Sequence, residues 1–585
     1  MVPLRLPDEV PVPHSFRRSL ALALVCAALA ISPTGRAQQS VRLKPADIII
    51  IHAKIYTVDE KRPWADSLAI LKGKIVAIGR EEEVIRRRGI GTKMIDAGSK
   101  LVLPGFTDCH VHFLEGGLSL SRVNLEGAHN VADIQALLRK YAEQHPNDPW
   151  LLGRGWDYTM FAPETLPDKK YLDPLFPVYA VFLEAYDGHT FWANSKALAL
   201  AGISKSTPDP LNGTIVRDPA TGEPTGALLE SAGDLVRKAA PPPNRVEQLN
   251  ALRAAMKLAV RNGITRVHSA GGDFGELEVL QELRGEKQLW VRFHIAYTAE
   301  PPELRPENLA AIEAAHKNFH DNWIDVQSVK FFLDGVMETH TAALLEPYAD
   351  DPRGKGSLFW DPAKYKAAVA ELDRKDLQIY THAVGDSAVR TALDTYEAVL
   401  HENHSKNRRH RVEHIETVAD ADIPRFGKLG VIASMQPLHS YPDRDTLDIW
   451  ARAIGPERAE RAWVWKSIAR RGGEYAFGSD WPVVTLNPFE GIQTAVTRQT
   501  REGQPEGGFV PSQKLTVAQA IEGYTRNAAF AGGREKTEGS LEVGKLADLI
   551  MLDRNIFEIS PSSIHQTNVV LTIVEGNIVY EADTH

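Results

Sequence analysis

The chain has 585 residues, of which 43% are hydrophobic and 24% are charged, proportions typical of a globular protein with a sizeable core. Its formal net charge of −9 argues against a nucleic-acid partner and against binding to an anionic membrane surface. The length exceeds that of one ordinary domain, although barrel domains also run well beyond the usual size.

Residues 1–37 have the features of an export signal. Arg17 and Arg18 precede the apolar stretch 20–31, and small residues occupy the −3 and −1 positions of a cleavage site after Ala37. The stretch is too short to span a bilayer comfortably, so we expect a periplasmic or secreted protein without stable membrane insertion. The alternative is a retained membrane anchor. Of the two cysteines, Cys26 leaves with the signal and Cys109 is interpreted as a core thiol, so no internal disulfide is expected.

Short β-rich segments lie near both ends of the remaining chain. Each pair of runs is joined by a glycine-containing turn, Gly73-Lys74 in the first and Gly576-Asn577 in the second. Neither segment is large enough to form a stable domain by itself. We therefore predict one composite β-sandwich built from residues 46–103 and 538–585. Its predicted strands are 46–57, 67–78, 548–552 and 569–580.

Residues 104–537 alternate between buried strand patterns and amphipathic helical patterns, which predicts an α/β fold of the (β/α)8 TIM-barrel type. The predicted strands are 101–110, 264–269, 290–297, 326–333, 378–382, 411–415, 431–435 and 475–479. Clear helical patterns cover 362–375, 389–402 and 451–470. The interval 113–262 is far longer than one connecting helix needs, so we expect it to contain a cap inserted after the first strand.

Polar residues stand at the ends of the predicted strands, where a barrel places its chemistry. The first strand ends in a His-x-His pair, and side chains alternate along a strand, so His110 and His112 point to the same face. Each such residue alone has an ordinary structural explanation, as a hydrogen-bonded histidine, an anion-binding lysine or a turn aspartate. Together, in this order, they predict a metal centre. The residues are His110, His112, Lys330, His382, His414 and Asp480.

This ligand order resembles the amidohydrolase superfamily of metal-dependent hydrolases. The phrases VKFFLDG, THAVGD, VEHIE, GSDWPV and DGHTFWANSKAL resemble its family 3 branch, which includes N-substituted formamide deformylase. The resemblance covers nearly the whole chain after the signal. It implies an enzyme that hydrolyses a carbon–nitrogen bond other than a peptide bond, in a small amide or formamide substrate.

The resemblance also implies a site with two ions, zinc or a similar divalent metal, bridged by Lys330 after carboxylation of its amine. Metal-activated hydroxide would attack the amide, and Asp480 would carry the proton to the leaving nitrogen. The residues assigned to one ion are His110, His112 and Asp480, and those assigned to the other are His382 and His414.

Five further residues are predicted to face the substrate. Trp156, His189 and Trp192 lie in two aromatic segments of the insertion, which favour a substrate with an apolar or aromatic part. The alternative for the tryptophans is that they only pack the interior of the cap. His268 and Asp334 fall at the expected barrel mouth, as substrate-facing residues or as partners of the ligands rather than ligands themselves.

Two other functions remain open from the residues alone. The same metals could serve ester hydrolysis or an isomerisation, because such sites are reused for different reactions. A metal- or ligand-binding protein without turnover would show the same ligands, although it has no need of Asp480 as a proton carrier. A homodimer is compatible with the sequence.

Overall fold

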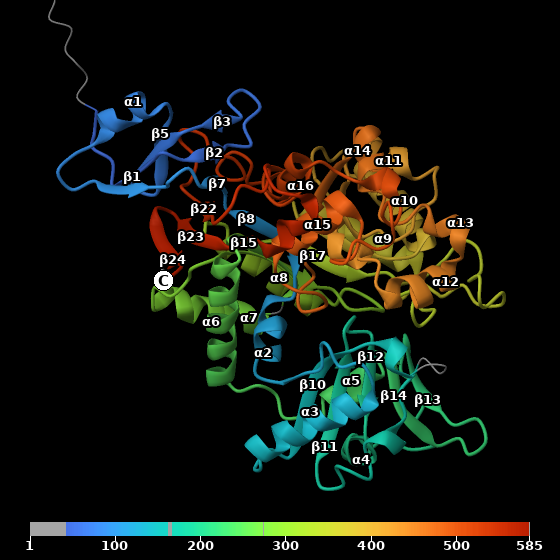
Figure 1. Cartoon of the computed structure of the whole chain (residues 1–585). Helices are drawn as coiled ribbons and strands as arrows, with labels where there is room; N and C mark the ends of the chain where they lie inside the picture. Colours follow the sequence, from blue (N-terminus) through green and yellow to red (C-terminus); the bar gives the residue numbers. More distant parts are fainter. Residues whose placement is uncertain (1–42, 162–165, 273, 584–585) are drawn as a thin grey trace, which may run out of the picture. The chain divides into compact units, whose positions relative to one another are not determined.

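The computed structural model describes residues 43–161, 166–272 and 274–583 (Figure 1). The predicted export signal and Cys26 lie outside the described residues. The described residues from Pro45 onwards form one compact unit, whose architecture follows. Within the part of the chain that is described, no helix combines the length and the apolar character that crossing a membrane requires.

Eight parallel strands form the barrel, in the order β21-β20-β19-β18-β17-β16-β15-β8. Nearly every residue of these strands is buried, as expected where helices cover one face and packed side chains fill the other. The predicted α/β TIM-type barrel is therefore confirmed. The strands are β8 (Phe106–Val111), β15 (Ile264–Gly272), β16 (Arg292–Thr298), β17 (Ile324–Phe332), β18 (Gln378–Ala383), β19 (Arg411–His414), β20 (Ile432–Met435) and β21 (Glu474–Phe477).

One helix predicted from the sequence pattern is divided in the structure. The predicted helix 451–470 is interrupted, because Gly455 adopts a φ of 80° and Pro456 follows it, so the chain forms three short helices. These are α12 (Ala451–Ile454), α13 (Pro456–Ala459) and α14 (Trp465–Arg470). The other helices of the barrel are α7 (Phe274–Gly285), α8 (Pro306–Asn318), α9 (Pro362–Arg374), α10 (Asp386–Glu402), α11 (Ile423–Leu429), α15 (Pro488–Thr497), α16 (Val517–Gly523) and α17 (Arg526–Ala531).

The predicted first strand, 101–110, is two strands in two different sheets. Gly105 N donates to Asp548 O at 3.0 Å, whereas Phe106 N donates to Gly263 O at 2.9 Å. The backbone thus changes partners at this point. Residues 101–104 form β7 (Leu101–Pro104) beside the C-terminal strand β22 (Leu549–Leu552), and β8 enters the barrel.

Both ends of the chain contribute to a pair of stacked sheets. One sheet has the order β5-β4-β1-β6 and the other β24-β23-β22-β7-β2-β3, with one apolar core that includes Ile50, Ile70, Leu549 and Ile573. The remaining elements are β1 (Ile48–Ile51), β2 (Lys54–Tyr56), β3 (Trp64–Ala65), β4 (Ser67–Leu71), β5 (Lys74–Gly79), α1 (Glu81–Val84), β6 (Lys93–Asp96), β23 (Val569–Val574) and β24 (Asn577–Glu581).

Between β8 and β15 the chain builds a second α/β layer, residues 120–244, which we call the cap. It is flanked by α2 (Phe113–Ser119) and α6 (Arg245–Arg261), which pack against each other. Its sheet has the order β13-β14-β12-β11-β10-β9, with helices α3 and α4 beside it (Figure 1). The cap elements are β9 (Val123–Asn124), α3 (Val131–Gln144), β10 (Trp150–Trp156), β11 (Ala180–Ala185), β12 (Thr190–Ala193), α4 (Ser195–Leu200), β13 (Gly213–Arg217), β14 (Pro224–Glu230) and α5 (Gly233–Arg237).

Candidate metal centre and substrate cavity

Closure of the barrel brings the ends of its first and last strands together. Asp480 N donates to His110 O at 2.7 Å, and His112 N donates to Trp481 O at 2.8 Å. Glycine is required at position 478, where a Cβ would lie 2.4 Å from His110 N. As a result, Asp480 Oδ1 lies 3.4 Å from His110 Nε2 and 3.2 Å from His112 Nε2.

The ends of three intervening strands supply the other predicted ligands. His414, at the end of β19, places Nδ1 3.7 Å from Asp480 Oδ2, and the ring of His382 from β18 lies 4.5 Å from the His414 ring. Lys330 on β17 places Nζ 3.2 Å from His110 Nε2. All six predicted residues therefore gather at one end of the barrel. Ligand atoms of His110, His414 and Asp480 lie within 4.8 Å of one another.

The orientation of His110 is set by two charged residues that the sequence reasoning did not identify. Glu413 Oε2 lies 2.5 Å from His110 Nδ1, and Arg411 holds the same carboxylate through Nε at 2.7 Å and Nη2 at 2.8 Å. A carboxylate can only accept, so Nδ1 carries the proton and Nε2 carries a lone pair towards Asp480. Side chains alternate along β19, so Arg411 and Glu413 lie on the same face of the strand.

These residues fit a divalent cation. Burial lowers the pKa of His110, His382 and His414 well below the ordinary value, so their imidazoles are neutral and can donate electron pairs. His414 Nε2 is buried and has no hydrogen-bond partner among the described residues. Asp480 Oδ1 faces two imidazoles and likewise forms no hydrogen bond with a described residue. Neutral imidazoles with a carboxylate are a donor set suited to zinc and similar ions.

Two of the ligand residues have unusual backbone conformations. His414 and Asp480 have φ values of 70° and 62°, in the left-handed region that non-glycine residues rarely occupy. Such conformations persist where the surrounding structure holds them, often at functional sites. At the same centre, burial lowers the pKa of Lys330 to about 8, which raises the fraction of neutral amine.

Four of the six predicted metal ligands line a cavity of about 510 Å³, to which the barrel and the cap both contribute; they are His112, His382, His414 and Asp480. His189 of the cap lies on its wall, with Nδ1 2.7 Å from Glu230 Oε2 and its ring 5.5 Å from that of His382. Burial would lower the pKa of His189, but the charge and hydrogen bond of Glu230 outweigh burial and raise it to about 9. His189 is therefore a cation at neutral pH, and Nε2 is its ring nitrogen available to a ligand.

The tryptophans predicted to face the substrate lie elsewhere. Trp156 and Trp192 are fully buried in the apolar core of the cap, where each packs edge-on against Phe161 at 5.3 and 5.2 Å. Neither is among the described residues that line the cavity. The structure thus gives both the packing role that was the alternative interpretation.

His268 and Asp334 are also placed away from the cavity wall. His268 is buried inside the barrel with Nδ1 3.1 Å from Arg411 Nη1. Asp334 accepts hydrogen bonds from three backbone N–H groups, and these fix the loops that follow β17 and β18. Its Oδ1 lies 3.7 Å from His382 Nε2, so Asp334 helps to position His382, one of the predicted metal ligands. The donors are the N–H groups of Ala343, Val384 and Gly385.

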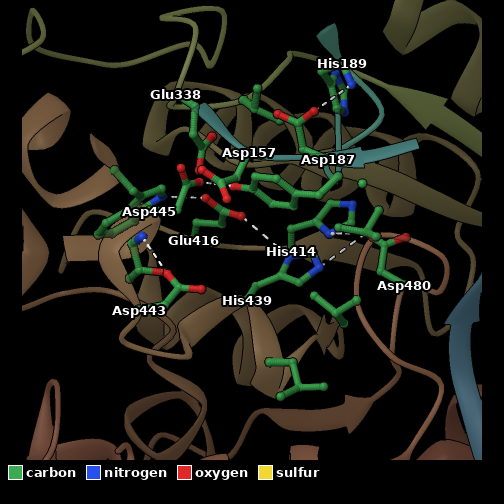
Figure 2. A pocket seen from close by; sticks show the side chains of 18 of the residues that line it. Asp157, Asp187, His189, Glu338, His414, Glu416, His439, Asp443, Asp445 and Asp480 are labelled. Carbon is green, nitrogen blue, oxygen red and sulfur yellow. Dashed lines mark hydrogen bonds and ion pairs between the residues drawn. The ribbon is translucent and has the colours of Figure 1, made fainter. Parts of the chain in front are cut away.

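His439 is a cavity residue that the sequence reasoning missed. Its Nε2 lies 3.5 Å from Asp480 Oδ2, its Nδ1 lies 3.6 Å from Glu416 Oε1, and its ring stacks on His414 at 5.7 Å (Figure 2). It follows the end of the predicted strand 431–435 by four residues. The rule applied to the other strands, that the residues after a strand carry function, would have indicated it.

Comparisons with known proteins agree with this geometry. A family model described as "Amidohydrolase family" matches residues 93–580. "Protein LONG AFTER FAR-RED 3" of Arabidopsis thaliana is 32% identical over 546 residues, which cover 92% of each chain. "N-substituted formamide deformylase" of Arthrobacter pascens is 26% identical over 555 residues, covering 92% of this chain and 98% of that one. A solved structure, an uncharacterized metal-dependent hydrolase from Pyrococcus horikoshii, superposes with a TM-score of 0.71 at 25% identity, covering 88% of this chain and 99% of that one.

Proposed function

This chain belongs to the amidohydrolase family, and we propose that it hydrolyses the carbon–nitrogen bond of a small N-substituted amide or formamide. One observation carries the proposal, the convergence of His110, His414 and Asp480 beside a cavity large enough for a small molecule. The deformylase relative, matched over nearly its whole length, supports this class of bond.

The residues of the site suit this reaction. His110, His112, His414 and Asp480 would hold one divalent ion, and Lys330 and His382 lie where they could share a second. When bound, such an ion polarises a carbonyl and lowers the pKa of water from about 15.7 towards about 7.

Two side chains would then take part in the reaction: Asp480 would transfer a proton, and His189 would stabilise negative charge. The carboxylate of Asp480 is placed to accept a proton from the attacking water and to deliver it to the leaving nitrogen. His189, charged and exposed to the cavity, is placed to donate a hydrogen bond to the carbonyl oxygen as negative charge develops there.

The test begins with protein stripped by a chelator and reloaded with zinc. Loaded protein should release amines from some of a library of N-formyl, N-acyl and cyclic amides, with the product amine detected directly. Stripped protein should be inactive, and it should unfold at lower temperature, because an ion present at ~1,000 times its Kd stabilises by about 4 kcal/mol. Full activity in verified metal-free protein would contradict the proposal.

We also propose that the protein is exported, supported by the arginine pair, the apolar stretch and the small residues before Gln38. N-terminal sequencing of material from the source cell should begin near Gln38. Intact Met1 in a membrane fraction would instead favour the retained anchor.

A further inference from the structure

The cavity has a second chemical character away from the metal-ligand residues. Apart from Asp480, seven carboxylates line it, and we call five of these, from five separate segments, the acidic wall. Figure 2 shows four of them, Asp157, Glu338, Glu416 and Asp445, gathered on the side away from Asp480. The members are Asp157 and Asp187 from the cap, Glu338 after β17, Glu416 after β19 and Asp445 after β20.

The charge of this wall is not balanced by cations of the protein. Arg444 is the only lysine or arginine among the described residues that line the cavity, and its guanidinium is 78% exposed and lies 3.4 Å from Asp448. The other cation, His189, is paired with Glu230. Glu416 and Asp445 are buried and the other three carboxylates are half-buried. Like charges gathered in this way without a counter-ion repel one another, so the wall favours a positive ligand.

Hydrogen bonding within the wall is also incomplete. Tyr186 donates to Asp445 Oδ2, and the same hydroxyl lies 3.3 Å from Glu338 Oε1, yet a hydroxyl has one proton to give. Asp445 is 8% exposed, and its Oδ1 has no hydrogen-bond partner among the described residues. A buried acceptor without a donor costs ~1–3 kcal/mol, and a donor on a ligand bound at the wall would remove this cost. In line with this crowding, burial and then neighbouring carboxylates raise the pKa of Asp445 to about 8, so without a ligand this carboxyl holds its proton at neutral pH, and a bound cation would favour its ionised form.

The surroundings distinguish an organic cation from a bare metal ion. Trp450 and Trp463 line the same cavity and stack with ring centroids 4.4 Å apart, and aromatic rings beside carboxylates are typical of sites for organic ammonium groups. In the described part of the chain, the only three metal-binding side chains whose ligand atoms lie within 4.8 Å are His110, His414 and Asp480. The acidic wall is therefore too open to hold an ion by itself.

We propose that the substrate carries a cationic nitrogen, an ammonium or guanidinium group, that the acidic wall binds while the amide lies at the metal-ligand residues. The inference deepens the proposed function and rests on it. His439 indicates the length of the linker, because its ring reaches from Asp480 to Glu416 with contacts of 3.5 and 3.6 Å. A chain of a few methylene groups spans that separation.

The test compares two substrates that differ in one group. N-formyl-1,4-diaminobutane ends in an ammonium, and N-formylpentylamine has a methyl group in its place. With zinc-loaded protein we expect kcat/KM to be at least about tenfold higher for the cation, the scale of a charge-assisted contact. Asp445→Asn and Glu338→Gln should each reduce this ratio by about tenfold. Either variant suffices if the other fails to fold.

A matched control removes the same charge from the same helical segment. Asp448 is 60% exposed and lies outside the cavity lining, so Asp448→Asn should change the ratio less than about twofold. If Asp448→Asn changed the ratio as much as Asp445→Asn, the preference for the cation would come from the overall negative charge of the protein rather than from the acidic wall. That result would overturn the inference.

Binding separates this inference from the proposed function. In calorimetry, pentylammonium should bind the zinc-loaded protein and 1-pentanol should not, and Asp445→Asn should weaken pentylammonium binding. Amide turnover without a preference for the cation would overturn the inference and leave the proposed function intact. Ammonium binding without turnover of any amide would contradict the proposed function, and with it the amide substrate, and would leave the acidic wall as a binding site for an organic cation. Complete displacement of pentylammonium by calcium would assign the wall to an inorganic ion and overturn the inference.

Discussion

Asp480 lies within 3.7 Å of four histidines at the centre of the site, and the two roles proposed for it, ligand and proton carrier, can be separated by substitution. Asn in its place keeps an oxygen that can ligate weakly but has no basic carboxylate. In Asp480→Asn we expect metal content to fall modestly and kcat to fall by ~10²-fold or more, the scale of a lost general base. His110→Ala should lose metal and activity together. Metal analysis beside kinetics checks both, and wild-type turnover in metal-replete Asp480→Asn would exclude the proton-carrier role.

The grouping of the six predicted ligands could be foreseen because each lies at or just after the end of a recognisable strand and has metal-binding chemistry. The same reasoning could not orient Trp156 or Trp192, because an aromatic residue on a cap strand packs equally well towards a core or a cavity. Glu413 was not identified either, since a strand carboxylate beside an arginine has the pattern of an ordinary ion pair.

At the scale of elements, helix α2 connects the first barrel strand to the cap and begins directly after His112. It packs closely against its neighbours, because a Cβ at Gly116 would lie 2.3 Å from Cε3 and Cζ3 of the Trp481 ring. Trp481 adjoins Asp480 in the sequence. A displacement of α2 would therefore shift both His112, which precedes the helix, and Asp480, which precedes Trp481.

The Gly116→Ala variant should move α2 or Trp481, lower the free energy of unfolding by ~1–3 kcal/mol and weaken metal retention. Denaturant unfolding and metal analysis measure the two effects. Gly285 at the end of α7 is the matched control, because a Cβ there would have no described atom within 4 Å. Gly285→Ala should change stability by less than about 1 kcal/mol and leave metal content unchanged. Equal metal content in both variants would contradict the role given to α2.

At the scale of the whole molecule, buried ion pairs connect the barrel to the C-terminal segment. Arg266 binds Glu538 through Nε at 2.7 Å, and Arg292 binds Asp548 through Nε at 2.7 Å. Both arginines are fully buried, and both acidic partners lie near or within the segment that pairs with β7.

Ending the chain before Thr537 should yield insoluble protein. The truncation removes β22 to β24, exposes the edge of β7, leaves the buried Arg292 without Asp548 and leaves Arg266 with Asp325 alone. Removing one partner of a buried ion pair costs ~3–5 kcal/mol. The soluble fraction after expression measures the effect. Ending the chain after Ala582 is the control and should leave solubility unchanged. Soluble, active protein lacking residues 537–585 would show that the barrel does not need the C-terminal strands.

The stability of the protein at low pH depends on Asp325, which is fully buried at the start of β17. Its carboxylate contacts Arg266, Arg534 and His294. Burial alone would raise its pKa, but its contacts with His294, Arg266 and Arg534 outweigh burial and hold the pKa well below the ordinary value. A depressed pKa contributes stability above the unfolded value of about 3.9, and this contribution is lost as pH falls further.

We expect Asp325→Asn to lower the free energy of unfolding by ~3–5 kcal/mol at pH 7. Below about pH 4 the wild type should lose stability more steeply than the variant, so the difference between them should narrow. Urea unfolding followed by tryptophan fluorescence between pH 7 and pH 3 measures this. A difference that stays constant with pH would contradict the assigned titration.

The sequence by itself determined the barrel, its strand order and the family, and it predicted six metal ligands that the structure brings together at one end of the barrel. Each of these depends on a local pattern, an apolar strand followed by a residue with the right donor atoms. Only the tertiary structure decided that residues 101–110 divide between two sheets at Gly105, because hydrogen-bond partners distant in the sequence change there. It likewise decided the acidic wall, whose five carboxylates come from separate loops and meet only when the barrel closes and the cap packs over it.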